Sequence, residues 1–177
     1  MFLTEFFGLF SLSAFIMWGF LMAFLFNIFV YSLSIKRDTT LLLSSFIMMT
    51  SYTVSDYFLT WLSIKITVYL DWALYDYTTL TALVVCYLII KKTTPSFLYL
   101  ILGLTINSFL FMFMYIDMYI YKNIEPWFLW DIYTFSVNLI DLIMIVALIV
   151  DRDFLGLHKL KNIIVSLFKK FNLKHSH

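Results

Sequence analysis

The sequence has few charged residues, and it has few of the residues that build disulfides, metal sites and tight turns. Only 13% of its 177 residues are charged and 63% are hydrophobic, whereas a soluble globular domain is about half apolar and about a quarter charged. The single cysteine, Cys86, excludes an internal disulfide and a multi-cysteine metal site. The first histidine is His158, so no long apolar run offers the two histidines of a bis-histidine haem site. This composition excludes a cytosolic enzyme and a nucleic-acid-binding domain.

Catalytic and phosphate-binding motifs are also lacking. The sequence contains no glycine-rich phosphate loop, no His/Cys/Glu metal cluster and no G-x-S-x-G turn. Of its four glycines, only Gly19 and Gly103 lie well inside apolar runs, and Pro95 and Pro126 lie at the edges of such runs. Secondary transporters commonly bind substrate at helices interrupted by glycine or proline. We therefore expect no enzyme, no cofactor and no metal, and a small-molecule or proton-coupled transporter is the weakest of the functions considered.

What the sequence does contain is a series of long apolar runs separated by short polar turns. A membrane-spanning helix needs roughly 20 apolar residues. The runs predict an all-α bundle of five transmembrane helices within residues 1–150, and residues 151–177 form a tail. Thr94 is expected to cap the fourth helix, with Pro95 at its first position. The predicted spans are about 7–33, 41–63, 72–90, 96–119 and 127–150.

The basic residues predict how the bundle is oriented. With five crossings, ten basic and three acidic residues fall on the side of Lys36, Lys91 and the tail. Basic residues concentrate on the cytoplasmic side of membrane proteins, so we expect the N-terminus outside and the C-terminus in the cytoplasm. The abundance of Phe, Ile, Tyr and Lys indicates a bacterial gene, and therefore the inner membrane.

Carboxylates occur inside two of the predicted spans. Asp141 lies near the centre of the last run and Asp56 lies in the second, where an ionised side chain costs about 2.5–3.5 kcal/mol. Spacings of three and four residues place several polar side chains of the last run on one helix face. Such a stripe either makes hydrogen bonds between helices or lines a path for cations. The predicted stripe and path consist of Asp56, Asp131, Thr134, Asn138 and Asp141.

Acidic and aromatic residues gather at the predicted outer turns. The aromatic rings are typical of a membrane interface, and together with the carboxylates they also suit an extracytoplasmic recognition surface. The predicted outer face consists of Asp71, Asp76, Asp117, Trp61, Trp72, Trp127 and Trp130.

The tail has the pattern of a basic amphipathic helix. Apolar residues recur at helical spacing from residue 157 onward, and the segment after residue 153 contains lysines but no acids. It would lie on anionic membrane lipid, dock a cytoplasmic protein or join an oligomerisation bundle. The residues predicted to make these contacts are Lys159, Lys161, Lys169, Lys170, Leu160, Ile164 and Phe168.

Two functions follow from this layout. The first is a small bacterial inner-membrane subunit, homo-oligomeric, that senses or anchors at the membrane and docks a cytoplasmic effector through its tail, as in a stress or phage-defence system. The alternative is an oligomeric cation-conducting channel lined by Asp56, Asp131 and Asp141. Membrane lipid is the expected surrounding, and nucleic acid is not an expected partner.

Overall fold

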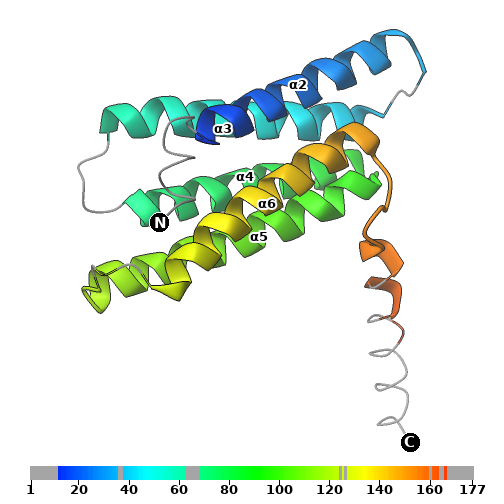
Figure 1. Cartoon of the computed structure of the whole chain (residues 1–177). Helices are drawn as coiled ribbons and strands as arrows, with labels where there is room; N and C mark the ends of the chain where they lie inside the picture. The colour runs from blue at the N-terminus through cyan, green and yellow to red at the C-terminus, as the bar shows by residue number, and fades with distance from the viewer. Residues whose placement is uncertain are drawn as a thin grey trace, which may run out of the picture.

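The protein is described by a computed structural model in which five long helices follow one another along the chain. The described residues are 12–35, 38–62, 68–123, 125, 127–159, 161–163 and 166, with only the backbone described at 12, 13 and 56–62. The helices are drawn in Figure 1. They are α2 (Leu12–Ser32), α3 (Thr39–Leu62), α4 (Val68–Ile90), α5 (Pro95–Tyr115), which continues directly into a π-helical turn η1 (Ile116–Ile120), and α6 (Phe128–Val150).

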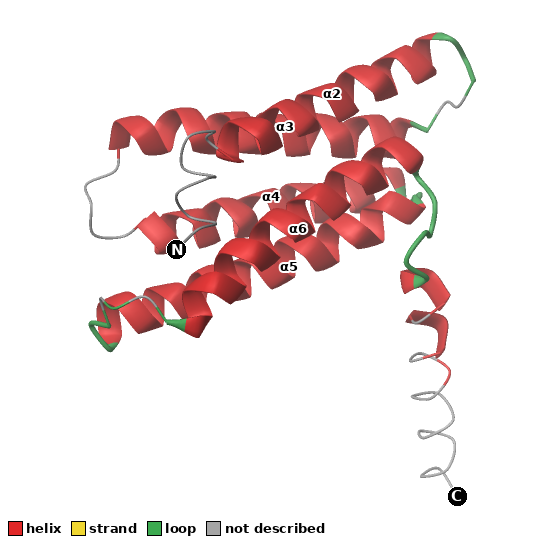
Figure 2. Ribbon diagram, viewed as in Figure 1, coloured by secondary structure: helices red, strands yellow, loops and turns green. Residues whose placement is uncertain are grey.

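The predicted all-helical class is confirmed for the described part of the chain. Figure 2 shows helices joined by short loops, and a helix of about 21 residues extends ~32 Å, close to the thickness of the bilayer's apolar core. Four helices are long and apolar enough to cross a membrane, namely Ala14–Ser32, Val68–Ile90, Pro95–Ile120 and Phe128–Val150. Helix α3 is 24 residues long, but Ser and Thr interrupt its apolar sequence and it is not among these four.

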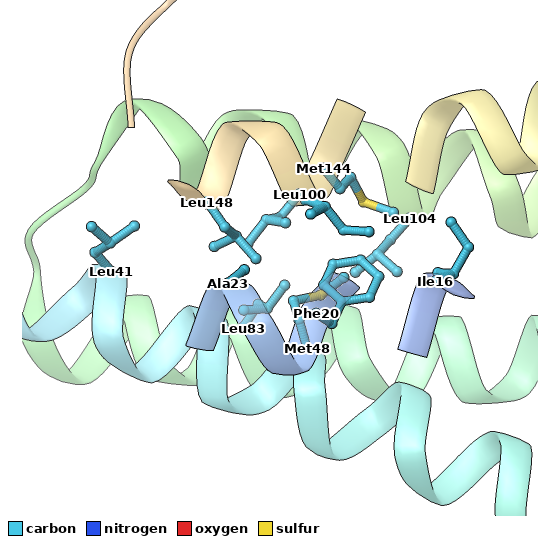
Figure 3. Close-up of a cluster of buried hydrophobic side chains, with 11 residues drawn as sticks. Ile16, Phe20, Ala23, Leu41, Met48, Leu83, Leu100, Leu104, Met144 and Leu148 are labelled. Atoms are coloured by element: carbon cyan, nitrogen blue, oxygen red, sulfur yellow. The ribbon is translucent and has the colours of Figure 1, made fainter. Parts of the chain in front are cut away.

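The helices close into a ring around one apolar core. Helix α2 packs against α3 and α6, and the neighbouring pairs α3–α4, α4–α5 and α5–α6 complete the ring. Every helix contributes side chains to the buried centre, which Figure 3 shows in close-up. Phe20 of α2 and Met48 of α3 are fully buried there, as are Leu83 of α4, Leu104 of α5 and Leu148 of α6. Helices α2 and α6 therefore bury part of each other's apolar surface.

Three chain segments meet at one end of the bundle, which we call the junction end. The Thr40 hydroxyl at the start of α3 donates to the carbonyl of Lys92, 3.0 Å away, and the Lys92 ammonium lies 2.5 Å from Oδ1 of Asp38. The backbone N–H of Ser96 donates to Oδ1 of Asp151, 3.2 Å away, just after α6. The turns before α3 and α5 and the end of α6 are thus brought together, as alternating helix directions require.

The start of α5 corrects one prediction about capping. Pro95 does occupy the first turn after Thr94, but the Thr94 side chain makes no capping hydrogen bond. Its hydroxyl pairs instead with the hydroxyl of Ser96, 2.9 Å away. The Asp151 carboxylate from the end of α6 satisfies the free N–H of Ser96 in its place. A carboxylate at this position also complements the partial positive charge of the helix N-terminus.

Candidate functional site

A buried polar cluster lies in the middle of the helix ring, and Asp141 is its centre. Asp141 is 5% exposed. Its Oδ1 accepts a hydrogen bond of 2.6 Å from the hydroxyl of Tyr52 on α3 and another of 2.8 Å from Nδ2 of Asn107 on α5. Three helices are therefore joined at one carboxylate oxygen. Asp141 faces the interior of its own bundle.

A second carboxylate, Asp76 of α4, belongs to the same region. Asp76 is 8% exposed, and its carboxyl group lies near enough to Asp141 and Tyr52 for a charge on one group to affect the others. One turn further along α4, the Thr79 hydroxyl pairs closely with that of Ser51 on α3. Oδ2 of Asp76 and Oδ1 of Asn107 are buried and meet no hydrogen-bond donor within the described residues.

No cationic side chain within the helices balances these carboxylates. The sequences of α2 to α6 and of η1 contain no Lys, Arg or His. Burying an ionised carboxylate without a partner is strongly unfavourable. The hydrogen bonds from Tyr52 and Asn107 stabilise Asp141, whereas Oδ2 of Asp76 has no donor in the described part of the bundle.

The predicted polar stripe of α6 does not assemble as one buried surface. Asp131 and Thr134 are exposed, and the Thr134 hydroxyl donates to its own helix at the carbonyl of Trp130. Asn138 likewise donates to the carbonyl of Thr134. Among the members of the stripe whose side chains are described, Asp141 is the one that is buried. The side chain of Asp56 lies outside the described residues.

Asp76 and Asp117, two of the residues predicted for the outer face, are buried between helices, and the side of the membrane on which they lie stays a prediction. Oδ2 of Asp117 accepts hydrogen bonds from the indole nitrogens of Trp127 (2.9 Å) and Trp130 (3.3 Å). The carboxylate therefore fastens η1 to the start of α6. Trp127 itself remains 49% exposed, as an aromatic residue at an interface would be.

Other aromatic rings extend from this end toward the carboxylates. Tyr69 and Trp72 of α4 lie edge to face with centroids 5.5 Å apart, and Tyr69 lies 5.6 Å from Tyr133 of α6. Trp72 also packs on Phe111 of α5. Asp71 is half-buried near the start of α4, and the Trp61 side chain lies outside the described residues. We call this the aromatic end.

At the junction end, Tyr99 of α5 holds the segment that follows α6. Its hydroxyl donates to Oδ1 of Asp153 (2.8 Å) and accepts the backbone N–H of Leu155 (2.8 Å). The Tyr99 ring stacks on Phe154 with centroids 4.9 Å apart. The backbone N–H of His158 donates to Oδ2 of Asp153, 3.1 Å away. These residues form what we call the tail clasp.

The carboxylate of the tail clasp is held in its charged form. Partial desolvation raises the pKa of Asp153, but the hydrogen bonds from Tyr99 and from the His158 backbone lower it, as does the His158 charge, and the pKa lies below its ordinary value. Asp153 therefore stays an acceptor for both donors at neutral pH.

The described part of the tail beyond the clasp is helical and exposed. Residues 157–159, 161–163 and 166 are helical, and Lys159 and Lys161 are exposed. Figure 1 shows this segment turning away from the bundle axis after α6. Leu160, Ile164, Phe168, Lys169 and Lys170 lie outside the described residues, so the amphipathic pattern stays a prediction.

The sequence analysis did not predict that Tyr52, Asn107 and Asp76 form one cluster. For two of these residues, the sequence did contain a feature that could have indicated it. Asn107 is an amide near the middle of an apolar run, and Asp76 follows Asp71 by more than one helical turn. Tyr52 carried none, because tyrosine is ordinary in an apolar helix.

Two further observations limit the chemistry of the bundle. The described residues contain no group of three or more His, Cys, Asp or Glu side chains that could hold a metal ion. An open pocket between α3 and α4 is lined by apolar side chains such as Leu43, Ile47 and Val85, together with Cys86, and it brings no charged group.

Comparison with known protein families, with curated proteins and with solved structures finds no match to this chain. The residues described above are therefore the basis for any functional inference.

Proposed function

We propose that this chain is a multi-pass membrane protein of the bacterial inner membrane that holds a basic cytoplasmic segment in a fixed orientation for an effector protein. In this proposal all five helices cross, with the N-terminus outside and the tail inside. The protein would act as an anchor or sensor subunit, as in a stress or phage-defence system.

The observation that carries the proposal is the tail clasp. A segment that merely followed the last helix would need no such contacts, yet Tyr99 of α5 contacts Asp153, Phe154 and Leu155. The hydroxyl bonds and the ring stacking fix where the exposed lysines at 159 and 161 begin. Fixing a segment in advance lowers the entropy lost when a partner binds it.

The five-crossing topology is supported by the contacts at the junction end. Asp38, Lys92 and Asp151 lie close to three different helix ends there. If all five helices cross, the turn after α2 and the turn after α4 would lie on the same side of the membrane as the tail. The basic residues of all three segments would then face the cytoplasm, as positive-inside distribution favours.

Orientation can be measured with cysteine labelling. Cys86→Ser removes the single native thiol, and Lys122→Cys or Ser166→Cys then introduces one reporter on each side. We expect a membrane-impermeant maleimide to label the first reporter and not the second in intact cells, and to label both after lysis. Labelling of the Ser166→Cys variant in intact cells would contradict the orientation.

Docking can be tested by crosslinking in the native host. Cells producing the full chain, a chain lacking residues 154–177, or Tyr99→Phe would be compared at equal membrane levels. We expect one cytoplasmic protein to be captured by the full chain, lost with the deletion and reduced in Tyr99→Phe. Tyr77→Phe, which alters an exposed tyrosine of α4, serves as the matched control. Equal capture by the full and shortened chains contradicts the proposal.

The alternative, an oligomeric cation channel lined by Asp141, is less favoured by the geometry. A carboxylate lining a pore between protomers would face outward from each bundle, whereas Asp141 is 5% exposed and bonded to Tyr52 and Asn107 of its own chain.

A further inference from the structure

The interior of the bundle holds two carboxyl groups, and its helices contain no basic side chain that could balance them if both were ionised. Asp76 and Asp141 are 8% and 5% exposed, and they lie near enough for a charge on one to affect the other. Helices α2 to α6 contain no Lys, Arg or His. Two ionised carboxylates that share a buried site repel each other. A bound cation, or a proton on one of the two carboxyl groups, would remove that repulsion.

The hydrogen bonds show which acceptor atoms of the cluster lack a partner. Oδ1 of Asp141 has two donors, Tyr52 and Asn107. Oδ2 of Asp76 and Oδ1 of Asn107 have none within the described residues, although Asn107 is only 1% exposed. The Asn107 amide bonds Asp141 directly, so its unpartnered oxygen belongs to the same cluster. Buried acceptors rarely lack a partner in native proteins, and these two lack one together.

We propose that this cluster binds one exchangeable monovalent cation, either Na⁺ or a proton, between Asp76 of α4 and Asp141 of α6. The shared chemistry is a single positive charge held by acceptor oxygens. The Asn107 amide oxygen of α5 supplies a further acceptor, and oxygen ligands suit a hard cation.

A monovalent ion fits better than the other classes of cation. Two hydrogen-bond donors already stabilise an ionised Asp141, so one positive charge beside Asp76 is enough to relieve the repulsion between the two carboxylates. Transition metals favour imidazole and thiolate ligands, and the described residues contain no group of three or more His, Cys, Asp or Glu side chains that could hold a metal.

The groups around the site leave it without a competing charge. Tyr52 approaches from α3 and bonds Asp141, and Tyr133 of α6 lies near enough to both carboxyl groups to be affected by their charge. From α2 comes Phe20, whose ring lies 4.3 Å from that of Tyr52. Tyr133 in turn contacts Tyr69, so tyrosine side chains connect the site with the aromatic end. This inference goes beyond effector docking and does not depend on the tail.

The test uses the full-length protein purified in detergent, with its unfolding temperature as the readout. One arm titrates NaCl against choline chloride at constant ionic strength and pH, and the other varies pH without Na⁺. A ligand at 100-fold excess over its dissociation constant should raise the unfolding temperature by roughly 5–10 °C. Dependence on Na⁺ identifies the ion as Na⁺, and dependence on pH alone identifies it as a proton.

The decisive variant is Asp76→Asn, because it removes the carboxylate whose oxygen lacks a donor and leaves the Tyr52–Asp141–Asn107 bonds in place. We expect it to abolish the cation-dependent rise, while the matched control Asp131→Asn, on the exposed side of α6, retains it. A chain lacking residues 154–177 should respond like the full chain. The proposal is overturned if neither cation changes the unfolding temperature, or if Asp76→Asn responds like the parent protein.

Discussion

The hydroxyl of Tyr99 lies 2.8 Å from Oδ1 of Asp153, so a side chain in the first turns of α5 directly holds the segment that leaves α6. The same hydroxyl accepts the N–H of Leu155. A single oxygen atom thereby couples the bundle to the tail.

Removing that oxygen should loosen the tail without unfolding the bundle. Tyr99→Phe keeps the ring that stacks on Phe154 but loses both hydrogen bonds, at a cost of about 1–3 kcal/mol to the local structure. We expect faster protease cleavage between residues 154 and 160 and little change in the global unfolding temperature. If cleavage is no faster than in Tyr77→Phe, the hydroxyl does not hold the tail.

The tail clasp should also respond to acid. The pKa of Asp153 lies below its ordinary value in the folded protein, because the donors Tyr99 and His158 outweigh partial desolvation. Its contribution is therefore fully present above the unfolded-state pKa of about 3.9 and is lost as pH falls through the lower folded-state pKa. Hydrogen exchange at the Leu155 and His158 amides should accelerate over that range.

In Asp153→Asn the same amides should exchange faster at neutral pH and show less additional change on acidification. Exchange that follows the same pH dependence in both proteins would mean that another group controls the clasp.

The buried hydrogen bonds at Asp141 predict a difference between two substitutions. Asp141→Leu leaves the donors of Tyr52 and Asn107 without an acceptor, at about 1–3 kcal/mol each. Asp141→Asn keeps one acceptor oxygen and should lose less stability. Denaturant unfolding in detergent measures both. Asn138→Leu, whose side chain bonds only its own helix, is the control, and equal stability of Asp141→Leu and this control would contradict the prediction.

Two glycines in the bundle predict unequal effects of one methyl group. A Cβ at Gly103 would lie 2.5 Å from Sδ and 2.8 Å from Cγ of Met144, and 3.2 Å from Ile140. At Gly19 the nearest atom, also 2.5 Å away, is the rotatable Cδ1 of Ile145. Overpacking costs about 1–3 kcal/mol, against a gain of up to about 1 kcal/mol in helix propensity.

We therefore expect Gly103→Ala to destabilise the protein more than Gly19→Ala in the same denaturant assay. The double variant Gly103→Ala with Met144→Ala should be less destabilised than the sum of its single changes, because the two residues are in contact. Additive effects would show that α5 and α6 do not depend on this close approach.

The helix boundaries could be predicted because charged turns separate the apolar runs. The last helix ends at Val150 as expected. Helix α4 begins at Val68, earlier than the predicted start near residue 72. The prediction began the span after the charged residue Asp71, but Asp71 lies within the first turn of the helix. An acid there is favourable near the positive end of the helix dipole, so a charge that limited the predicted span is part of the helix.

Which way each helix faces could not be predicted from the sequence. Helices that are apolar all round carry little periodicity, so a polar residue alone had to indicate the buried side. Ten residues are about 2.8 helical turns, which places Asp131 about 80° around the axis from Asp141. Asp131 is exposed and Asp141 is buried accordingly. The pairing of Asp141 with Tyr52 and Asn107 depends on packing between three helices.

The contact between α2 and α6 has a consequence for how the protein is made. The ring cannot close during synthesis until the last helix has left the ribosome, because α6 covers one side of α2. Until then Tyr52 and Asn107 lack the carboxylate that joins them. A nascent chain stopped before residue 128 would present these groups and Asp76 to lipid or to the insertion machinery. Completion of the bundle is thus the step that encloses these polar groups.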